Sequence, residues 1–441
     1  MSMKRFMAIY RFLLISTGPL HIGDDDGELL IEENSGRAVL PGTSFIGVLK
    51  AYAKKNEEEQ LVSELFGSDR PADQKIASSL QIRDMVSKEQ AAIEYRPSVR
   101  IDGRFGSADD QGKFEHVFVA AGTRFQGEFY VSAETEKQSE QFHQIACNCI
   151  AAINHGFIRF GAYKGIGGGL MKAENFRYSI YDLFKIDDFF LLFSRKDEQE
   201  KMSRFEDINL PEAAGKQEYK FSLSVRFDAP MLIRSDTSVE QSLDDTASKH
   251  LDAAPIRSSD GKYIIPGSSW RGVLRHQMER ILGYYGQTSL LDDIFGNSGD
   301  KNPSSGKIYV SDALITSDRS ADYYGIHIDK LTGGVMKGAL RQERTVWGRA
   351  LFQLNLAEER QEKAEKAAGA ILLGLRDIAE GSVNLGSHSS GGFGYLRGES
   401  LTVRSPEGAV SVDFRRQSVE NKALVDRWLA RLQGGKANEA V

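Results

Sequence analysis

The sequence contains two copies of one set of motifs, separated by 225 residues. The segment Pro41–Lys50 (PGTSFIGVLK) returns as Pro266–Arg275 (PGSSWRGVLR), and 266 − 41 gives the offset of 225. A later glycine-rich segment, Arg159–Gly169, returns as Asn384–Gly394 at the same offset of 225. Because both motifs recur in the same order at the same spacing, we infer that the chain arose by duplication of one domain.

Shorter matches extend the repeat. Leu65–Gly67 (LFG) corresponds to Ile294–Gly296 (IFG), and Pro19–Ile22 resembles Pro230–Ile233 at an offset of 211. The second copy therefore carries 225 − 211, or about 14, extra residues before its Pro-Gly motif. The stretch between the copies is charged and polar, which is typical of a linker. We predict a first domain at 1–194, a linker at 195–217, a second domain at 218–404 and a C-terminal extension at 405–441.

Each copy shows the same order of expected elements. Phe6–Leu14 and Tyr219–Phe227 are apolar or alternating runs that predict a first strand. The Ser or Thr after each Pro-Gly is a favourable N-cap residue, which predicts that a helix follows. The expected helices lie at about 43–58, 138–154, 268–283 and 357–379.

This order predicts the fold class α+β, with two tandem ferredoxin-like domains that each have an RRM-like βαββαβ core. The middle of each copy, at 85–115 and 313–343, is polar and rich in glycine. We expect both middle segments to form extended loops or hairpins that leave the core.

Composition limits the compartment and the kind of site. The two cysteines, Cys147 and Cys149, lie in an apolar stretch that reads as a core helix. Two cysteines exclude a disulfide framework and a Cys-rich zinc site, and they suit a reducing compartment. No run approaches the ~18 consecutive apolar residues of a membrane helix, and Met1–Tyr10 reads as a first strand, so we expect a cytoplasmic protein. The net charge of −6 argues against an indiscriminate nucleic-acid coat but allows a local basic groove.

The repeated motifs resemble those of the RAMP superfamily of CRISPR-associated proteins. The resemblance rests on the Pro-Gly helix start, the Leu/Ile-Phe-Gly triplet and the late glycine-rich loop, and it covers nearly all of both copies. The pattern is most similar to the backbone subunit of type III effector complexes, here as two fused copies, which points to a subtype such as D. The resemblance implies an antiviral ribonucleoprotein complex that contains the CRISPR guide RNA (crRNA), complementary target RNA and other type III effector subunits, including the large polymerase-like subunit.

The resemblance also implies a role for the middle segments. In that family a hairpin called the thumb displaces bases of the guide–target duplex at about six-nucleotide intervals, while the protein reads backbone and shape. Basic residues interleaved with apolar ones suit this task, because they follow a phosphate backbone and wedge bases apart. A surface loop without this role is the competing interpretation. The thumb candidates are Arg100, Arg104 and Phe105 in the first copy and His327 and Lys330 in the second.

Two further features of each copy are candidate guide-RNA contacts. A helix N-terminus presents free N–H groups to a phosphate, and basic residues follow in the next turns. Glycine-rich loops let a ligand approach the backbone closely. A structural helix cap and a tight turn are the competing interpretations. The candidates are Ser44, Lys50, Lys54, Gly161, Lys164, Gly165, Gly167 and Gly168 in the first copy, and Ser269, Arg271, Arg275, Gly386, His388, Ser389, Gly391 and Gly392 in the second.

Aspartate loops after the first strands carry the question of catalysis. In the family an Asp in this loop cleaves target RNA. The matching residues are Asp26, with Asp24 and Asp25 as competitors, and Asp252, with Asp245 as a competitor. RNA supplies its own nucleophile, the 2′-OH, so a protein needs to align the nucleotide and move a proton. A carboxylate suits the role of base or of ligand to Mg²⁺ or another divalent cation, so we expect a metal-dependent endoribonuclease. An acidic solvated turn is the competing interpretation.

Two other functions stay open from the sequence. One is a purely structural RNA-binding backbone subunit, with the chemistry elsewhere in the complex. The other is an endoribonuclease that processes the guide precursor, for which His21 and His155 would be the acid–base residues. Neither histidine has a counterpart in the other copy, so we interpret both as structural.

Overall fold

The computed structural model describes residues 4–24, 26–68, 76–101, 108–193, 198–211, 218–234, 251–297, 304–358 and 360–434. The chain forms two compact units, each considered by itself below. The first unit comprises Met1–Glu94, Val117–Lys164 and Gly168–Gly215. The second comprises Tyr95–His116, Gly165–Gly167 and Lys216–Val441, so it includes two short segments of the first sequence copy.

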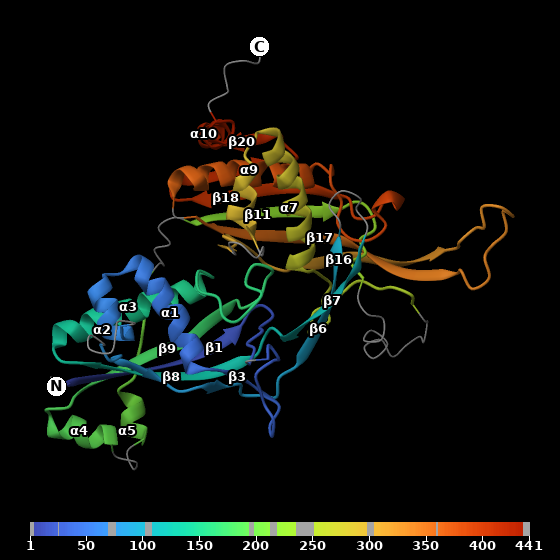
Figure 1. The fold of residues 1–441 in the computed structure, drawn as a ribbon. Helices are drawn as coiled ribbons and strands as arrows, with labels where there is room; N and C mark the ends of the chain where they lie inside the picture. Colours follow the sequence, from blue (N-terminus) through green and yellow to red (C-terminus); the bar gives the residue numbers. More distant parts are fainter. Residues whose placement is uncertain are drawn as a thin grey trace. The chain divides into compact units, whose positions relative to one another are not determined.

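The first unit is built on a five-stranded sheet in the order β10-β9-β1-β8-β4, in which every neighbouring pair is antiparallel (Figure 1). Two long helices, α1 and α3, pack on one face of this sheet, and α2 lies beside them. The chain order β1-α1-β4-β8-α3-β9 is the predicted βαββαβ core. The elements are β1 (Phe6–Ser16), β4 (Leu80–Ile82), β8 (Arg124–Ala133), β9 (Met171–Asp182), β10 (Glu206–Asp207), α1 (Gly42–Asn56), α2 (Glu59–Phe66) and α3 (Glu136–Asn154).

Alternation along β1 decides which face of the first sheet is covered. Successive residues of a strand point to opposite faces, and Tyr10, Phe12 and Leu14 are all buried against the helices. The Tyr10 ring stacks on Phe129 of β8 with 4.6 Å between ring centroids, and Phe12 stacks on Phe45 of α1 at 5.5 Å. Because burial of one such ring is worth roughly 1.5–3 kcal/mol, this aromatic row fixes α1 over the sheet.

The second unit repeats the same core. Its sheet contains the order β15-β17-β11-β18, which matches β4-β8-β1-β9 of the first unit. Helices α7 and α9 pack on one face, and β19, β20 and α10 extend the unit after β18 (Figure 1). The elements are β11 (Glu218–Phe227), β12 (Ile264–Ile265), β15 (Ile308–Val310), β16 (Ala313–Gly325), β17 (Arg341–Ala357), β18 (Leu396–Ser405), β19 (Gly408–Asp413), β20 (Ser418–Glu420), α7 (Gly267–Tyr284), α8 (Ser289–Phe295), α9 (Gln361–Ala379) and α10 (Lys422–Leu432).

Strand register confirms that the two cores are copies of each other. Phe12 pairs with Gly127 across β1 and β8, and Leu223 pairs with Phe352 across β11 and β17. These pairs keep the offsets of the sequence repeat, since 223 − 12 is 211 and 352 − 127 is 225. Both first strands also carry a register shift toward their last strand, close to the same position. The duplicated motifs therefore stand at equivalent places in two equivalent folds.

The predicted N-caps of the first helices are wrong. Both helices begin one residue earlier, at Gly42 and Gly267, and the preceding proline is the N-cap without a side-chain hydrogen bond. The free N–H groups are satisfied by distant carboxylates instead. Gly42 N donates to Asp84 Oδ1 and Gly267 N donates to Asp312 Oδ1, both at 2.8 Å. The Ser and Thr residues that looked like caps lie inside the first turn.

Other expected boundaries shift for visible reasons. The stretch 43–58 ends at Asn56, and α2 starts at Glu59 as a separate helix. The second helix of the first copy starts at Glu136, because the Thr135 side chain accepts a hydrogen bond from Gln138 N. The counterpart in the second copy starts later than expected, at Gln361, because β17 runs through Ala357.

The middle segments form hairpins, as expected. In the first copy β6 pairs with β7, and in the second β16 pairs with β17 out to Gly325 and Arg341. Short strands complete the described chain. They are β2 (Ile31–Glu32), β3 (Arg37–Leu40), β5 (Met85–Val86), β6 (Ile93–Ile101), β7 (Ala108–Val119), β13 (Gly296–Asn297) and β14 (Ser304–Ser305), with a 3-10 turn, η2, at Ser389–Gly391.

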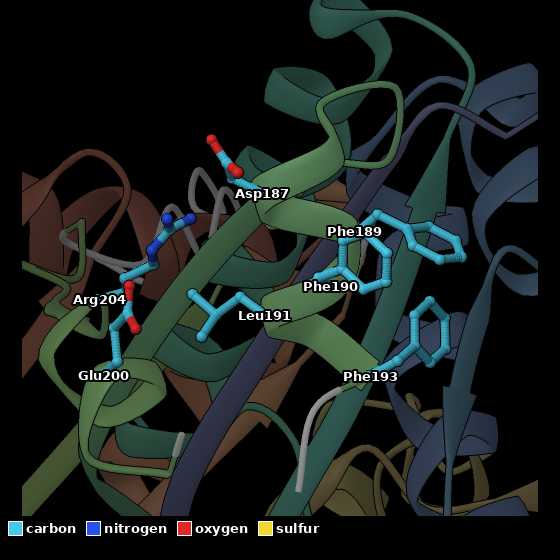
Figure 2. Close-up of a pocket in the computed structure, with 7 residues that line it drawn as sticks. All are labelled: Asp187, Phe189, Phe190, Leu191, Phe193, Glu200 and Arg204. Carbon is cyan, nitrogen blue, oxygen red and sulfur yellow. The ribbon is translucent and has the colours of Figure 1, made fainter. Parts of the chain in front are cut away.

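The two sheets differ on the face opposite their long helices. In the first unit, residues after β9 form α4 (Ile186–Phe193) and α5 (Glu198–Ser203), which is part of the segment predicted as a linker. Leu191 of α4 packs with Ile9, Tyr181 and Phe205 over this face. Figure 2 shows Phe189 and Phe193 on the side of α4 away from Arg204, beside a pocket of about 750 Å³. The lining residues are Asp187, Phe189, Phe190, Leu191, Phe193, Glu200 and Arg204.

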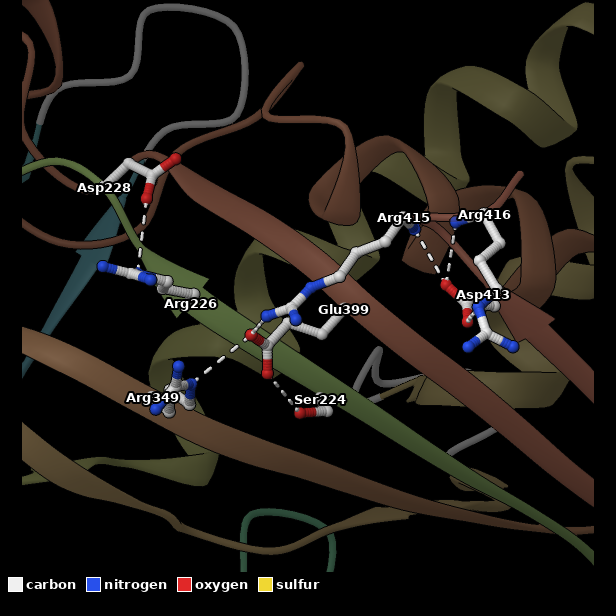
Figure 3. A network of polar contacts seen from close by, with 8 residues as sticks. All are labelled: Ser224, Arg226, Asp228, Arg349, Glu399, Asp413, Arg415 and Arg416. Carbon is white, nitrogen blue, oxygen red and sulfur yellow. Dashed lines mark hydrogen bonds and ion pairs between the residues drawn. The ribbon is translucent and has the colours of Figure 1, made fainter. Parts of the chain in front are cut away.

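The corresponding face of the second sheet is polar. Glu399 on β18 accepts hydrogen bonds from Ser224 Oγ and Arg349 Nε, both at 3.3 Å, and pairs with Arg415 (Figure 3). Burial alone would raise the pKa of Glu399, but the guanidinium groups of Arg349 and Arg415 hold this pKa below its ordinary value. The face therefore presents arginines that are organised around a charged carboxylate.

Two expectations from composition hold in the described residues. Cys147 and Cys149 are free thiols buried in the first core, and burial raises the pKa of Cys147 to about 11. Among the described residues, no helix is long and apolar enough to cross a membrane.

Candidate RNA-binding site

The helix starts differ in how strongly their basic residues are held. On α1, Ser44 and Lys54 are exposed and Lys50 is half-buried. On α7, the equivalent Arg275 lies over the Phe295 ring at 5.6 Å and within 3.9 Å of Asp292. A guanidinium held against an aromatic ring loses less freedom when it binds a phosphate. The α7 arginines are thus better preorganised than the α1 lysines.

Arg271 is tied into the protein itself. Its Nη2 donates to Phe295 O at 2.8 Å, and its guanidinium lies over the Phe295 ring. Burial, together with the nearby Arg275 charge, lowers the pKa of Arg271 to about 10, so the group stays charged at neutral pH. Ser269 lies half-buried in the first turn of the same helix. The predicted RNA contact of Arg271 would therefore compete with a contact that joins α7 to α8.

Most glycines of the late loops serve close packing within the protein. A Cβ at Gly161 would stand 2.0 Å from His21 O, and a Cβ at Gly386 would stand 2.4 Å from Leu232 O. Both glycines have positive φ, of 69° and 87°. The next residue donates to the same carbonyl in each copy, at 2.8 Å. In both copies, glycine is needed here to let the loop close on the turn after the first strand.

The remaining loop candidates divide by exposure. Gly391 and Gly392 in the second copy are exposed, and a Cβ at Gly392 would meet nothing within 4 Å. Ser389 beside them is exposed as well. In the first copy, Gly167 and Gly168 are buried, and burial lowers the pKa of Lys164. The second copy therefore offers the more open backbone for a ligand.

Asp252 lies at the foot of the hairpin that β16 and β17 form. Its backbone N donates to Gln342 O at 2.8 Å, and its Oδ2 accepts from Gln342 N at 2.6 Å. The following residue, Ala253, bridges Glu343 of β17. The residue Asp252 is exposed, and its second oxygen, Oδ1, is outside the Gln342 bond. The loop thus holds the carboxylate in a fixed place at the end of a predicted thumb.

A second polar cluster shares this stretch of β17. His388 Nε2 lies 2.8 Å from Glu343 Oε2, and Arg234 Nη2 donates to Glu343 Oε1 at 2.9 Å. The same Arg234 nitrogen lies 3.1 Å from His388 Nε2. The sequence singled out His388 and Asp252 for separate reasons, and the structure brings them to adjacent residues of one strand. Reasoning from the sequence missed Arg234 and Glu343 as site residues, although Glu343 stands in the repeat opposite another glutamate, Glu115.

The aspartate loop of the first copy is organised by Asp24. Its Oδ1 accepts from Asp26 N and from Glu28 N, each at 3.0 Å. An aspartate that caps its own loop in this way is the ordinary structural use of the residue. Asp26 is exposed beside it, so the geometry favours Asp26 over Asp24 as the residue with a carboxylate available to a ligand.

The hairpin of the second copy carries an apolar tip. Ile328 bridges Val335, and Asp329 Oδ1 accepts from Leu331 N at 2.7 Å, so the turn is ordered. Leu331 is 96% exposed, and His327 and Lys330 are exposed on the same tip. Figure 1 shows this hairpin extending from the sheet of its unit. An ordered turn with exposed apolar and basic side chains has the chemistry to separate stacked bases.

The first hairpin is described in part. Arg100 is exposed on β6, among the exposed apolar residues Val99 and Ile101. Four predicted site residues lie outside the described residues, namely Asp25, Arg104, Phe105 and Asp245.

The two histidines that a guide-processing enzyme would need have packing contacts. His21 is 8% exposed, and its Nδ1 lies 2.7 Å from Val117 O. The ring of His155, at the C-terminal end of α3, stacks on Phe157. These contacts agree with the structural interpretation of both residues.

The family assignment follows from comparison with known proteins. The sequence profile of the RAMP superfamily matches residues 14–172 and again residues 225–397. The chain belongs to the RAMP superfamily. The two matches coincide with the two sequence copies and the two ferredoxin-like cores, so the protein consists of two fused RAMP domains. A search of curated proteins gave no match. RAMP membership supports a CRISPR-associated, RNA-binding role.

Proposed function

We propose that this RAMP protein is a double backbone subunit of a type III CRISPR effector complex, which holds the guide–target duplex and cleaves target RNA with loop aspartates. The observation that carries the proposal is the place of Asp252. Its exposed carboxylate is fixed to Gln342 N at the foot of an ordered hairpin with an apolar tip. A thumb that displaces a base would bring the backbone beside that base to this carboxylate.

Cleavage would use the RNA's own 2′-OH. That oxygen attacks the adjacent phosphorus, the bond from phosphorus to the 5′ oxygen breaks, and the products are a cyclic phosphate and a 5′-hydroxyl. Asp252 would accept the proton from the 2′-OH, and the leaving 5′ oxygen would take a proton from solvent. Arg234 and His388, held on Glu343, would contact the phosphate from the same strand. Displacement of the nucleotide would let the attacking and leaving oxygens align.

A divalent cation fits this place only as a shared ligand. Among the described residues, no three His, Cys, Asp or Glu side chains gather as a metal site. Mg²⁺ commonly binds to one or two carboxylates together with substrate phosphates and waters, which Asp252 and an RNA phosphate would supply. The ion would then neutralise charge that develops on the phosphate.

The test is to map cuts in labelled target RNA by the assembled complex with a guide and Mg²⁺. Asp252→Asn retains an oxygen for Gln342 N but removes the charge, so we expect the adjacent cut to slow by about 100-fold or more. Asp26→Asn should remove the cut of the first copy, about six nucleotides away if neighbouring thumbs set the interval. Asp24→Asn is the matched control, because Asp24 orders the loop and the cut should persist. Cuts that persist in both Asp26→Asn and Asp252→Asn would refute the catalytic assignment.

A purely structural backbone role is the second candidate. It is favoured by the glycine loops, whose closest contacts are with the protein's own backbone in both copies. It predicts normal guide binding and normal cutting in both aspartate variants. The same cut-mapping experiment therefore separates the two functions.

A further inference from the structure

A nearly buried ion pair in the second unit joins residues that are far apart in the sequence. Arg96 on β6 donates through Nη1 to Asp312 Oδ2 at 2.6 Å, and the two side chains are 8% and 14% exposed. The other oxygen of Asp312 accepts from Gly267 N, at the start of α7. One carboxylate thus caps a helix with one oxygen and receives an arginine with the other.

The backbone next to this ion pair is also covered by a segment of the first copy. Ile166 forms a parallel bridge with Val310 of β15, the strand at that end of the core sheet. A Cβ at Gly267 would stand 2.6 Å from Ile166 O, and a Cβ at Gly167 would stand 3.0 Å from Asp312 Oδ1. The arginine and the glycine segment therefore approach one surface together, and glycine on both sides allows the contact.

The first RAMP domain carries the same surface. Asp84 Oδ1 accepts from Gly42 N at 2.8 Å, as Asp312 does from Gly267 N. Ile82 is the counterpart of Val310, because it pairs with Phe129 where Val310 pairs with Leu354, and 354 − 129 gives the repeat offset of 225. The strand of Ile82, β4, is the last in the order of its sheet. We call Gly42, Ile82 and Asp84 the receiving face.

The receiving face differs from its counterpart in exposure. Asp84 is exposed, whereas the side chain of Asp312 is 14% exposed beneath Arg96. An edge strand presents unpaired backbone groups that another chain can pair with. A carboxylate beside such an edge is complementary to a guanidinium.

We propose that the receiving face binds a RAMP-type domain of another polypeptide, which places an arginine from the base of its hairpin on Asp84 and a glycine-rich segment along Ile82. The inference goes beyond the proposed function, because it rests on the comparison of the two copies and needs neither RNA nor catalysis. It assigns to the first copy a protein contact that the chain already makes for its second copy.

The partner is a different chain, not a second molecule of this one. Val119 and Val346 are equivalent, because each bridges the turn after its first strand. Three residues earlier lie His116, opposite Arg96 in the first hairpin, and Glu343, which pairs with Tyr323 in the second. The second hairpin therefore has a tyrosine where the first has its arginine. Its surface cannot supply the guanidinium that Asp84 fits.

Photocrosslinking in the purified effector complex tests the proposal. A benzophenone amino acid at Arg83, next to Asp84, should crosslink to an arginine-bearing hairpin of another RAMP subunit, identified by mass spectrometry. The same group at the equivalent Ser311 is the internal control and should crosslink within the chain to residues 95–98. Crosslinks from position 83 to RNA, to a protein without such a hairpin, or only within this chain would overturn the proposal.

A charge variant measures the contact. Asp84→Asn keeps an oxygen for Gly42 N and removes the charge, so we expect affinity for the crosslinked subunit to fall by about 30-fold or more. Affinity of the isolated chain for guide RNA should stay the same, which separates this inference from the proposed function. Asp84→Arg combined with aspartate at the mapped arginine should restore assembly. A change of less than about 3-fold in Asp84→Asn would contradict the proposed ion pair.

Discussion

The ion pair between Arg96 and Asp312 makes a quantitative prediction about stability. In Asp312→Asn the amide oxygen still accepts from Gly267 N, so the helix cap is retained while the charge that faces Arg96 is lost. Hydrogen bonds to charged groups contribute about 1.5–3 kcal/mol, and solvent screens this pair little at 8% and 14% exposure. We expect Asp312→Asn to lower the free energy of unfolding of the second unit by about 2 kcal/mol.

The matched variant in the first copy is Asp84→Asn. It retains the same type of cap on Gly42, but Asp84 is exposed and its charge acts mainly on the helix N-terminus. That interaction is worth about 0.3–1 kcal/mol, so we expect a loss of about 0.5 kcal/mol in the isolated chain. The two substitutions are chemically identical, and their difference isolates the contribution of Arg96.

Urea denaturation of both variants is the assay, with hydrogen exchange of the β6 amides as a local measure. Asp312→Asn should lower the transition midpoint and speed exchange in residues 95–101, while Asp84→Asn should leave β6 exchange unchanged. If the two variants lose stability equally, within about 0.5 kcal/mol, or if β6 exchange is unchanged in Asp312→Asn, the pair does not hold β6 as described.

Three further predictions concern other parts of the molecule. Gly386→Ala should cost about 3 kcal/mol in urea denaturation, because its Cβ would stand 2.4 Å from Leu232 O at a φ of 87°, whereas Gly392→Ala, at a φ of 86° in open space, should cost about 1 kcal/mol; equal losses would contradict the close packing. Leu331→Ala should leave the midpoint of unfolding unchanged, because this side chain is 96% exposed, yet slow target cleavage by about 10-fold or more if the tip separates bases; cleavage at the normal rate would exclude that role. Burial alone would raise the pKa of Glu358, but hydrogen bonds from Lys307 Nζ and Arg360 N hold this pKa below its ordinary value, so the charge stabilises the fold above pH ~4.5 and the contribution is lost as pH falls through the lowered pKa. Glu358→Gln should therefore lower the midpoint of unfolding at pH 7 and have little effect near pH 3, and an equal loss at both values would show that the charge is not the cause.

The repeat made the fold predictable at the level of elements. Two equal offsets, the first strands and the late helices were enough to predict two βαββαβ cores, because hydrophobic periodicity and motif order are local properties. The helix starts were mispredicted for the opposite reason. Asp84 and Asp312 reach Gly42 and Gly267 from strands 42 and 45 residues away, and no local pattern announces such a cap.

The candidate site was predicted in part for the same reason. Asp252 was identified from its distance to a motif, but its bond to Gln342 N, 90 residues away, depends on how the loop folds back on β17. The glycines of the late loops were recognised as special, yet their closest contacts are with carbonyls of the protein. A sequence reveals that glycine is required, and only tertiary structure reveals what approaches it.

The most direct test of the central claim is photocrosslinking between this chain and a guide RNA that carries 4-thiouridine at single positions. If both RAMP domains bind the guide backbone, crosslinks should map to the α1 region and to the α7 region, from guide positions about six nucleotides apart, and should weaken together as salt rises. Crosslinks to one domain alone, or to neither at low salt, would contradict a double guide-binding backbone.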